Sequence, residues 1–150
     1  MTRYLFGVLF AVFFCLFAGA QSVSDFRLHT SGSKNTRFYN GNGAFAGRTV
    51  VSGSTTRFYN ADGSLAGMAR TSGNTTRFYN ADGSFAGRSQ KSGNTTRFYD
   101  RSGAFSGRSQ KSGNTTRIYD RNGAFSGRTT TTGSGTRYYR ANGSFGGRSR

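Results

Sequence analysis

A twenty-residue unit, repeated six times without an insertion, constrains the fold of this chain more than any other feature. Every copy carries Thr-Arg, a large apolar residue and Tyr, and two glycine columns keep the same period. The copies of this motif begin at Thr36, Thr56, Thr76, Thr96, Thr116 and Thr136. Self-similarity at a fixed period is typical of an array in which each unit packs on its neighbours. We therefore divide the chain into residues 1–20, a non-repeating lead-in at 21–32 and six repeats at 33–150.

Each unit predicts a β-hairpin. Residues 75–79 are rich in β-branched and aromatic residues, as strands prefer, and residues 84–90 form the expected return strand. Between them, Asn-Ala-Asp-Gly at 80–83 is typical of a type I turn followed by a glycine bulge. No segment of the repeats has helical periodicity. The predicted fold class is all-β, with about twelve short strands in up-and-down order.

The turn also predicts which residues share a face. If Asn80 pairs with Ser84, then Arg77 faces Gly87 and Arg88 falls on the opposite face. Each face would carry one aromatic stripe and one arginine stripe, which favours a thin array over a thick core. An elongated meander and a β-solenoid both fit this pattern. The solenoid would bring equivalent arginines about 4.8 Å apart, and the meander about 9.6 Å apart, so charge repulsion favours the meander.

Disorder is the remaining alternative for the repeats, because the net charge is high and aliphatic residues are few. The aromatic columns, and turn residues placed correctly in every copy, favour order.

The first twenty residues have the layout of a secretory signal peptide. Arg3 precedes an apolar run at residues 5–17, and the small residues 18–20 provide a cleavage site after Ala20. The apolar run is shorter than a bilayer span, so we favour cleavage over an uncleaved anchor. The expected location is therefore secreted, periplasmic or at the cell surface.

The composition excludes several kinds of site. The chain has one Cys and one His, which cannot form a disulfide framework or a Cys/His metal centre. Five Asp and no Glu oppose 21 basic residues, for a net charge of +16. The array holds at most one Asp in each unit, so no catalytic carboxylate pair is evident. We expect no enzyme activity, cofactor, metal or small-molecule substrate.

Two arginine columns make binding of an anionic polymer the main functional hypothesis. The guanidinium fork pairs with phosphate, sulfate or carboxylate groups, and neighbouring aromatic rings can stack on sugars or bases. The first column is Arg37, Arg57, Arg77, Arg97, Arg117 and Arg137. The second is Arg48, Arg88, Arg108, Arg128 and Arg148, with Met68 in the second copy. The tyrosines expected to contribute are Tyr59, Tyr79, Tyr99 and Tyr119.

The unit resembles the short hairpin repeats of choline-binding and glucan-binding cell-wall proteins. The segments Asn-Ala-Asp-Gly-Ser at 60–64 and 80–84 carry this resemblance, which covers residues 33–150. It implies a hairpin array with a surface-polymer role. Those families form Trp-rich ligand cages, and this chain has no Trp, so the ligand does not carry over. The unit is also similar, less specifically, to MORN and YD-type repeats.

A second hypothesis is a self-assembling fibre or matrix subunit. Strand-turn-strand repeats rich in Gly, Ser, Thr, Asn and Gln resemble those of curli-type secreted amyloids, and open array ends would template further chains. We thus expect an exported repeat protein that binds an acidic polysaccharide, lipopolysaccharide or nucleic acid, with self-association as the alternative.

Overall fold

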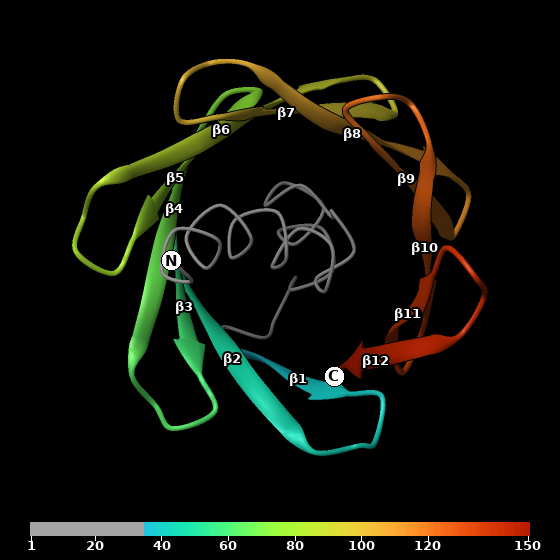
Figure 1. The fold of residues 1–150 in the computed structure, drawn as a ribbon. Coiled ribbons are helices and arrows are strands. Elements are labelled where there is room, and N and C mark those ends of the chain that lie inside the picture. The colour runs from blue at the N-terminus through green and yellow to red at the C-terminus, as the bar shows by residue number, and fades with distance from the viewer. Residues whose placement is uncertain (1–34) are drawn as a thin grey trace, which may run out of the picture.

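The computed structural model describes residues 35–150, which form twelve antiparallel strands closed into one barrel (Figure 1). The strands follow chain order around the barrel, and the last one pairs with the first. The all-β, up-and-down prediction is confirmed. The prediction of an open meander or solenoid is wrong, because both ends of the array pair with each other. The predicted signal peptide, the lead-in and residues 33–34 lie outside the described residues.

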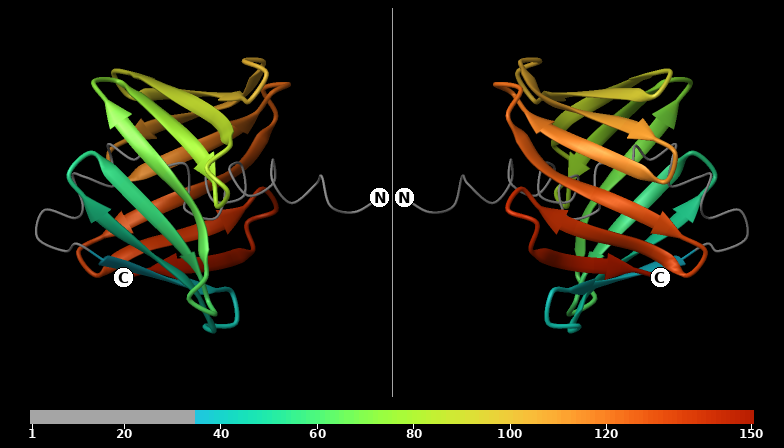
Figure 2. Two further views of the ribbon diagram at one scale, coloured as in Figure 1. Left: turned by 90° about the vertical axis from the view of Figure 1, so that its left-hand side faces the viewer. Right: turned by 90° about the vertical axis from the view of Figure 1, so that its right-hand side faces the viewer.

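Each repeat contributes one short and one longer strand, with the exception that the last strand ends early. The strands are β1 (Asn35–Asn40), β2 (Phe45–Ser52), β3 (Thr55–Asn60), β4 (Leu65–Ser72), β5 (Thr75–Asn80), β6 (Phe85–Ser92), β7 (Thr95–Asp100), β8 (Phe105–Ser112), β9 (Thr115–Asp120), β10 (Phe125–Thr132), β11 (Gly135–Arg140) and β12 (Phe145–Ser149). In side view the strands are tilted, and turns line both ends of the barrel (Figure 2). Among residues 35–150, no helix has the length and apolar character needed to cross a membrane.

The turn within each hairpin has the predicted geometry. The amide of Asn80 donates to the carbonyl of Ser84 at 2.9 Å, and the amide of Gly83 donates to the carbonyl of Asn80 at 3.0 Å. Gly83 has φ of +83°, which glycine adopts without strain. Asp82 Oδ1 accepts a hydrogen bond from the Ser84 amide at 2.9 Å. We call this end of the barrel the hairpin rim (turns 41–44, 61–64, 81–84, 101–104, 121–124 and 141–144).

A β-bulge directly after this turn changes which residues share a face. Ala86 is an extra residue, so Phe78 pairs with Gly87 and Arg77 pairs with Arg88. The predicted pairing of Arg77 with Gly87 is therefore wrong, and so is the placement of Arg88 on the opposite face. One inserted residue reverses the facing of the rest of the strand, because side chains alternate with period two. The same shift occurs in all six hairpins.

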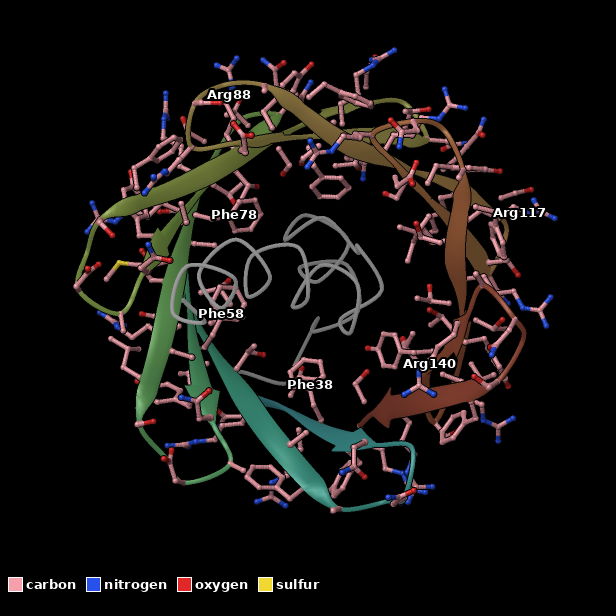
Figure 3. All side chains as sticks on the ribbon, viewed as in Figure 1. Phe38, Phe58, Phe78, Arg88, Arg117 and Arg140 are labelled. Carbon is pink, nitrogen blue, oxygen red and sulfur yellow. The ribbon has the colours of Figure 1, made fainter. Side chains whose placement is uncertain are left out.

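The bulges make the sheet strongly two-sided. Phe38, Phe58 and Phe78 point into the barrel, whereas Arg88 and Arg117 point away from it (Figure 3). Small residues of the return strands accompany the inner rings, and many of them are buried. The buried inner residues include Thr49, Thr56, Ala69, Thr76, Ser89, Thr96, Ser109, Thr116, Thr129, Thr136 and Ser149. The predicted arrangement, with aromatic and arginine stripes on both faces, is thus replaced by an outer wall that carries both arginine columns.

The last strand pairs with the first in the same register in which neighbouring repeats pair within the chain. Arg48 pairs with Tyr59 between the first and second repeats, and Arg148 pairs with Tyr39 between the last and the first. Arg37 and Arg150 exchange backbone hydrogen bonds of 2.8 and 3.0 Å at the same seam. The first repeat therefore occupies the place that a seventh would take. Closure pairs backbone groups that an open array would leave exposed at its edges.

Candidate polyanion-binding surface

The two arginine columns meet across the hairpins on the outer wall. In five of the six described hairpins, an arginine of the first column pairs directly with one of the second. These pairs are Arg37 with Arg48, Arg77 with Arg88, Arg97 with Arg108, Arg117 with Arg128, and Arg137 with Arg148. The second hairpin pairs Arg57 with Met68 instead. Side chains directly opposite each other start about 5 Å apart, so each pair concentrates two positive charges in one place.

Second-column arginines also cover the tyrosines of the following repeat. The Arg88 guanidinium carbon lies 5.1 Å from the centre of the Tyr99 ring, within cation–π range. Equivalent contacts join Arg48 to Tyr59 at 4.9 Å, Arg108 to Tyr119 at 5.1 Å, Arg128 to Tyr139 at 5.2 Å, and Arg148 to Tyr39 at 5.7 Å. Each contact contributes about 0.5–1 kcal/mol at an exposed site, which offsets repulsion within the arginine pairs.

The second repeat preserves this contact with a different residue. Met68 cannot supply a cation to Tyr79, but Arg70, two positions later on the same strand, lies 5.8 Å from its ring centre. Four other repeats have Val, Gln or Thr at the position of Arg70, and the sixth has Arg150. Every tyrosine of this column thus has a guanidinium over its ring.

A column of exposed rings completes the outer wall. Tyr99 meets Phe105 edge to face, with ring centres 6.1 Å apart. Such Phe residues are 39–41% exposed, and they are Phe45, Phe85, Phe105, Phe125 and Phe145. Across neighbouring strands, Gln90, Arg97, Arg108, Tyr119 and Phe125 follow one another in register. A stripe of cations followed by aromatic rings therefore crosses the wall toward the hairpin rim.

The carboxylates do not neutralise these columns. The four aspartates of residues 35–150 lie at the hairpin rim, and none is paired in the sheet with a column arginine. The Ser84 hydroxyl, and then its amide, lower the pKa of Asp82 by hydrogen bonding. Asp62 has the same arrangement, and the Ser102 hydroxyl lowers the pKa of Asp100. These carboxylates are thus engaged in hydrogen bonds within their own turns.

The described residues offer little for metal binding or acid–base catalysis. Within 35–150, no group of three or more His, Cys, Asp or Glu residues could hold a metal ion. The aspartates are separated, each in the turn of its own hairpin.

Each arginine and tyrosine predicted as a polymer contact lies on the outer wall. The register brings the two arginine columns together in pairs, which the sequence interpretation had put on opposite faces. The sequence interpretation also missed the arginine–tyrosine contacts, the role of Arg70 and the exposed Phe column. The sequence signal that could have found these features is the glycine column that contains Gly87. In every hairpin this glycine follows the extra residue of the β-bulge.

Comparison with known proteins found no family model that matches the chain, and no curated protein that matches it.

Proposed function

We propose that this is an exported protein whose outer wall binds an anionic polymer. The observation that carries the proposal is the set of five directly opposed arginine pairs, in each of which one arginine is held against a tyrosine ring. The ligand chemistry is a repeated phosphate, sulfate or carboxylate group, as in an acidic polysaccharide, a lipopolysaccharide or a nucleic acid. No catalytic step is part of the proposal.

The contacts around each arginine pair favour a ligand with several charges. Holding the guanidinium on a ring reduces the side-chain freedom that would be lost on binding. Arginine pairs repeat every second strand, which corresponds to about 9.6 Å around the wall. A polymer that engages one pair thereby brings its next anionic group within reach of another, so the contacts add as avidity.

The fibre alternative loses the feature that favoured it. It depended on open strand edges at the two ends of the array, and β1 is paired with β12. We therefore do not propose edge-to-edge assembly of residues 35–150.

A charge-matched pair of variants tests the proposal. The first replaces Arg97 and Arg117, which lie on the outer wall, by Gln. The second replaces Lys91 and Lys111, which lie on the inner-facing side of β6 and β8, by Gln. Both remove two positive charges. Binding to heparin, lipopolysaccharide and single- and double-stranded DNA is then measured against salt concentration.

We expect the arginine variant to weaken binding to at least one polymer. For DNA, the slope of log affinity against log salt should fall by about 1.8, from about 0.9 per lost phosphate contact. The lysine variant should keep the slope of the unmodified protein. Equal losses in the two variants would mean that overall charge, and not the outer wall, determines binding.

A further inference from the structure

The sixth repeat departs from the others at the turn between β10 and β11. Where the fourth repeat begins with Gly-Asn-Thr at 93–95, the sixth has Gly-Ser-Gly at 133–135. Gly93 has φ of +55°, typical of a left-handed turn residue, but Gly133 does not have a left-handed φ. The hydroxyl of Thr132 instead lies 3.2 Å from both the Ser134 hydroxyl and the Gly135 carbonyl. The last turn therefore has its own local structure.

Gly135 permits a close approach that the other repeats lack. A Cβ atom added there would collide with the backbone carbonyl oxygen of Ser149, and the φ of +135° is itself unfavourable for any other residue. The corresponding residues are Thr55, Thr75, Thr95 and Thr115. Glycine thus lets the end of β12 lie directly against the start of β11.

A small open pocket lies at this place. It has a volume of about 30 Å³, and its lining residues include Arg137, Arg148 and Arg150. Hydroxyl-bearing residues complete the lining, namely Thr132, Ser134, Thr136 and Ser149. Since a water needs about 10–15 Å³ measured in this way, the pocket has room for about two water-sized groups. That suits two oxygen atoms of a small polar group, with the rest of the group at the open mouth of the pocket.

The positive charge of the pocket is specific to the barrel seam. Arg150 occupies the position that is Gln90 and Gln110 in two other repeats, and Arg70 in the second, where Met68 stands in place of the second-column arginine. It adds a third guanidinium to the paired Arg137 and Arg148. Three arginines around one small pocket form an environment that favours an oxyanion, because each guanidinium can contribute charge-assisted hydrogen bonds, and the hydroxyls of Thr132 and Ser134 lie at the same turn.

We propose that this pocket binds one phosphate or sulfate group. The group is either a free ion or the terminal group of a larger molecule. The site differs from the outer-wall columns because it depends on Arg150 and on the departures of the sixth repeat, so it stands even if the wall binds no polymer. Bound anion would also reduce repulsion among arginines of β11 and β12, and thereby stabilise the closed barrel.

The test is calorimetric titration of the purified protein with inorganic phosphate, inorganic sulfate and glucose 6-phosphate in chloride buffer. We expect saturable binding of one anion per chain, and a thermal midpoint that rises more in phosphate than in chloride of equal ionic strength. Arg150→Gln installs the residue found at two of the equivalent positions, 90 and 110, and should weaken binding about tenfold or more, since a hydrogen bond to a charged group is lost. Binding of glucose 6-phosphate equal to that of phosphate would identify the terminal-group form of the ligand, and weaker binding the free ion.

The matched control is Arg101→Gln, which removes the same charge from the turn of an internal hairpin, outside both arginine columns, and should leave the affinity unchanged. Arg137→Gln is a second pocket variant if the first lowers stability, with folding followed by circular dichroism. Absence of saturable binding, or equal weakening in the Arg101 and Arg150 variants, overturns the proposal.

Discussion

Two separate effects make some glycines of the barrel wall sensitive to an added methyl group. One is a left-handed backbone conformation, and the other is close contact with the backbone of the next repeat. At Gly87, φ is +149°, and an added Cβ would lie 2.5 Å from the backbone oxygen of Tyr99 in the next repeat. At Gly67 the contact is equally short, with 2.5 Å to the Tyr79 oxygen, but φ is not left-handed. At Gly93, φ is +55° and nothing lies within 4 Å of the added atom. Alanine substitutions at these positions therefore separate backbone strain from collision.

The expected losses of unfolding free energy differ accordingly. Gly93→Ala costs about 1–2 kcal/mol, since only the left-handed conformation is disfavoured. Gly67→Ala costs about 1–3 kcal/mol, because one backbone must move away from another. Gly87→Ala combines both and costs about 2–5 kcal/mol. At roughly 4 °C per kcal/mol for a domain of this size, the thermal midpoint of the last variant falls by roughly 8–20 °C.

Thermal and urea unfolding of the three variants, monitored by circular dichroism, measures these losses. A Gly87→Ala protein as stable as Gly93→Ala would refute the close approach of adjacent repeats. Full stability of Gly67→Ala would refute it independently of any backbone strain.

Three further predictions concern titration and packing. The Tyr138 hydroxyl donates to Ser149 at 3.0 Å, and burial raises the pKa of this phenol. Stability should therefore be retained below pH 10 and fall above it. Tyr138→Phe should reduce this alkaline loss of stability in pH-dependent unfolding. Arg70→Gln should lower stability by about 0.5–1 kcal/mol and change the near-ultraviolet signal of Tyr79. Asp82 has a lowered pKa, so its stabilising effect should disappear as pH falls below about 4, and Asp82→Ala should flatten this part of the acid unfolding profile.

The sequence predicts those parts of the fold that are local. The hairpin turn at residues 80–83 depends on an Asx residue and on a glycine three residues later. The glycine is visible in every repeat and the Asx residue in the first five, with Arg140 in its place in the sixth. The bulge at Ala86 is less visible, since Ala and Gly fit either face without a penalty. Because facing alternates by residue, missing one extra residue moved Arg88 to the wrong side of the sheet.

Closure of the barrel depends on the curvature that all the hairpins produce together. Each repeat has the same local pattern whether its neighbours curve into a ring or extend as a ribbon, so β1 and β12 carry no separate signal for their pairing. The pairing between repeats also sets the contact of Arg88 with Tyr99, and the turn at 93–94 fixes that register.

The most direct test of the account is a crosslink across the closing strands. In a Cys15→Ser background, Tyr39→Cys and Arg148→Cys are introduced together, at positions that pair between β1 and β12. Paired positions lie about 4.5–5.5 Å apart between Cα atoms, within the range for a disulfide. Arg108→Cys with Tyr119→Cys is the positive control, because these positions pair in a closed or an open array.

Mass spectrometry and non-reducing electrophoresis after mild oxidation give the result. The closed barrel predicts a disulfide within one chain for the 39–148 pair, formed about as readily as in the control. In an open ribbon these positions would be eleven strands apart, or about 53 Å. Reduced cysteines, or disulfides only between chains, would contradict closure and with it the outward gathering of the arginines.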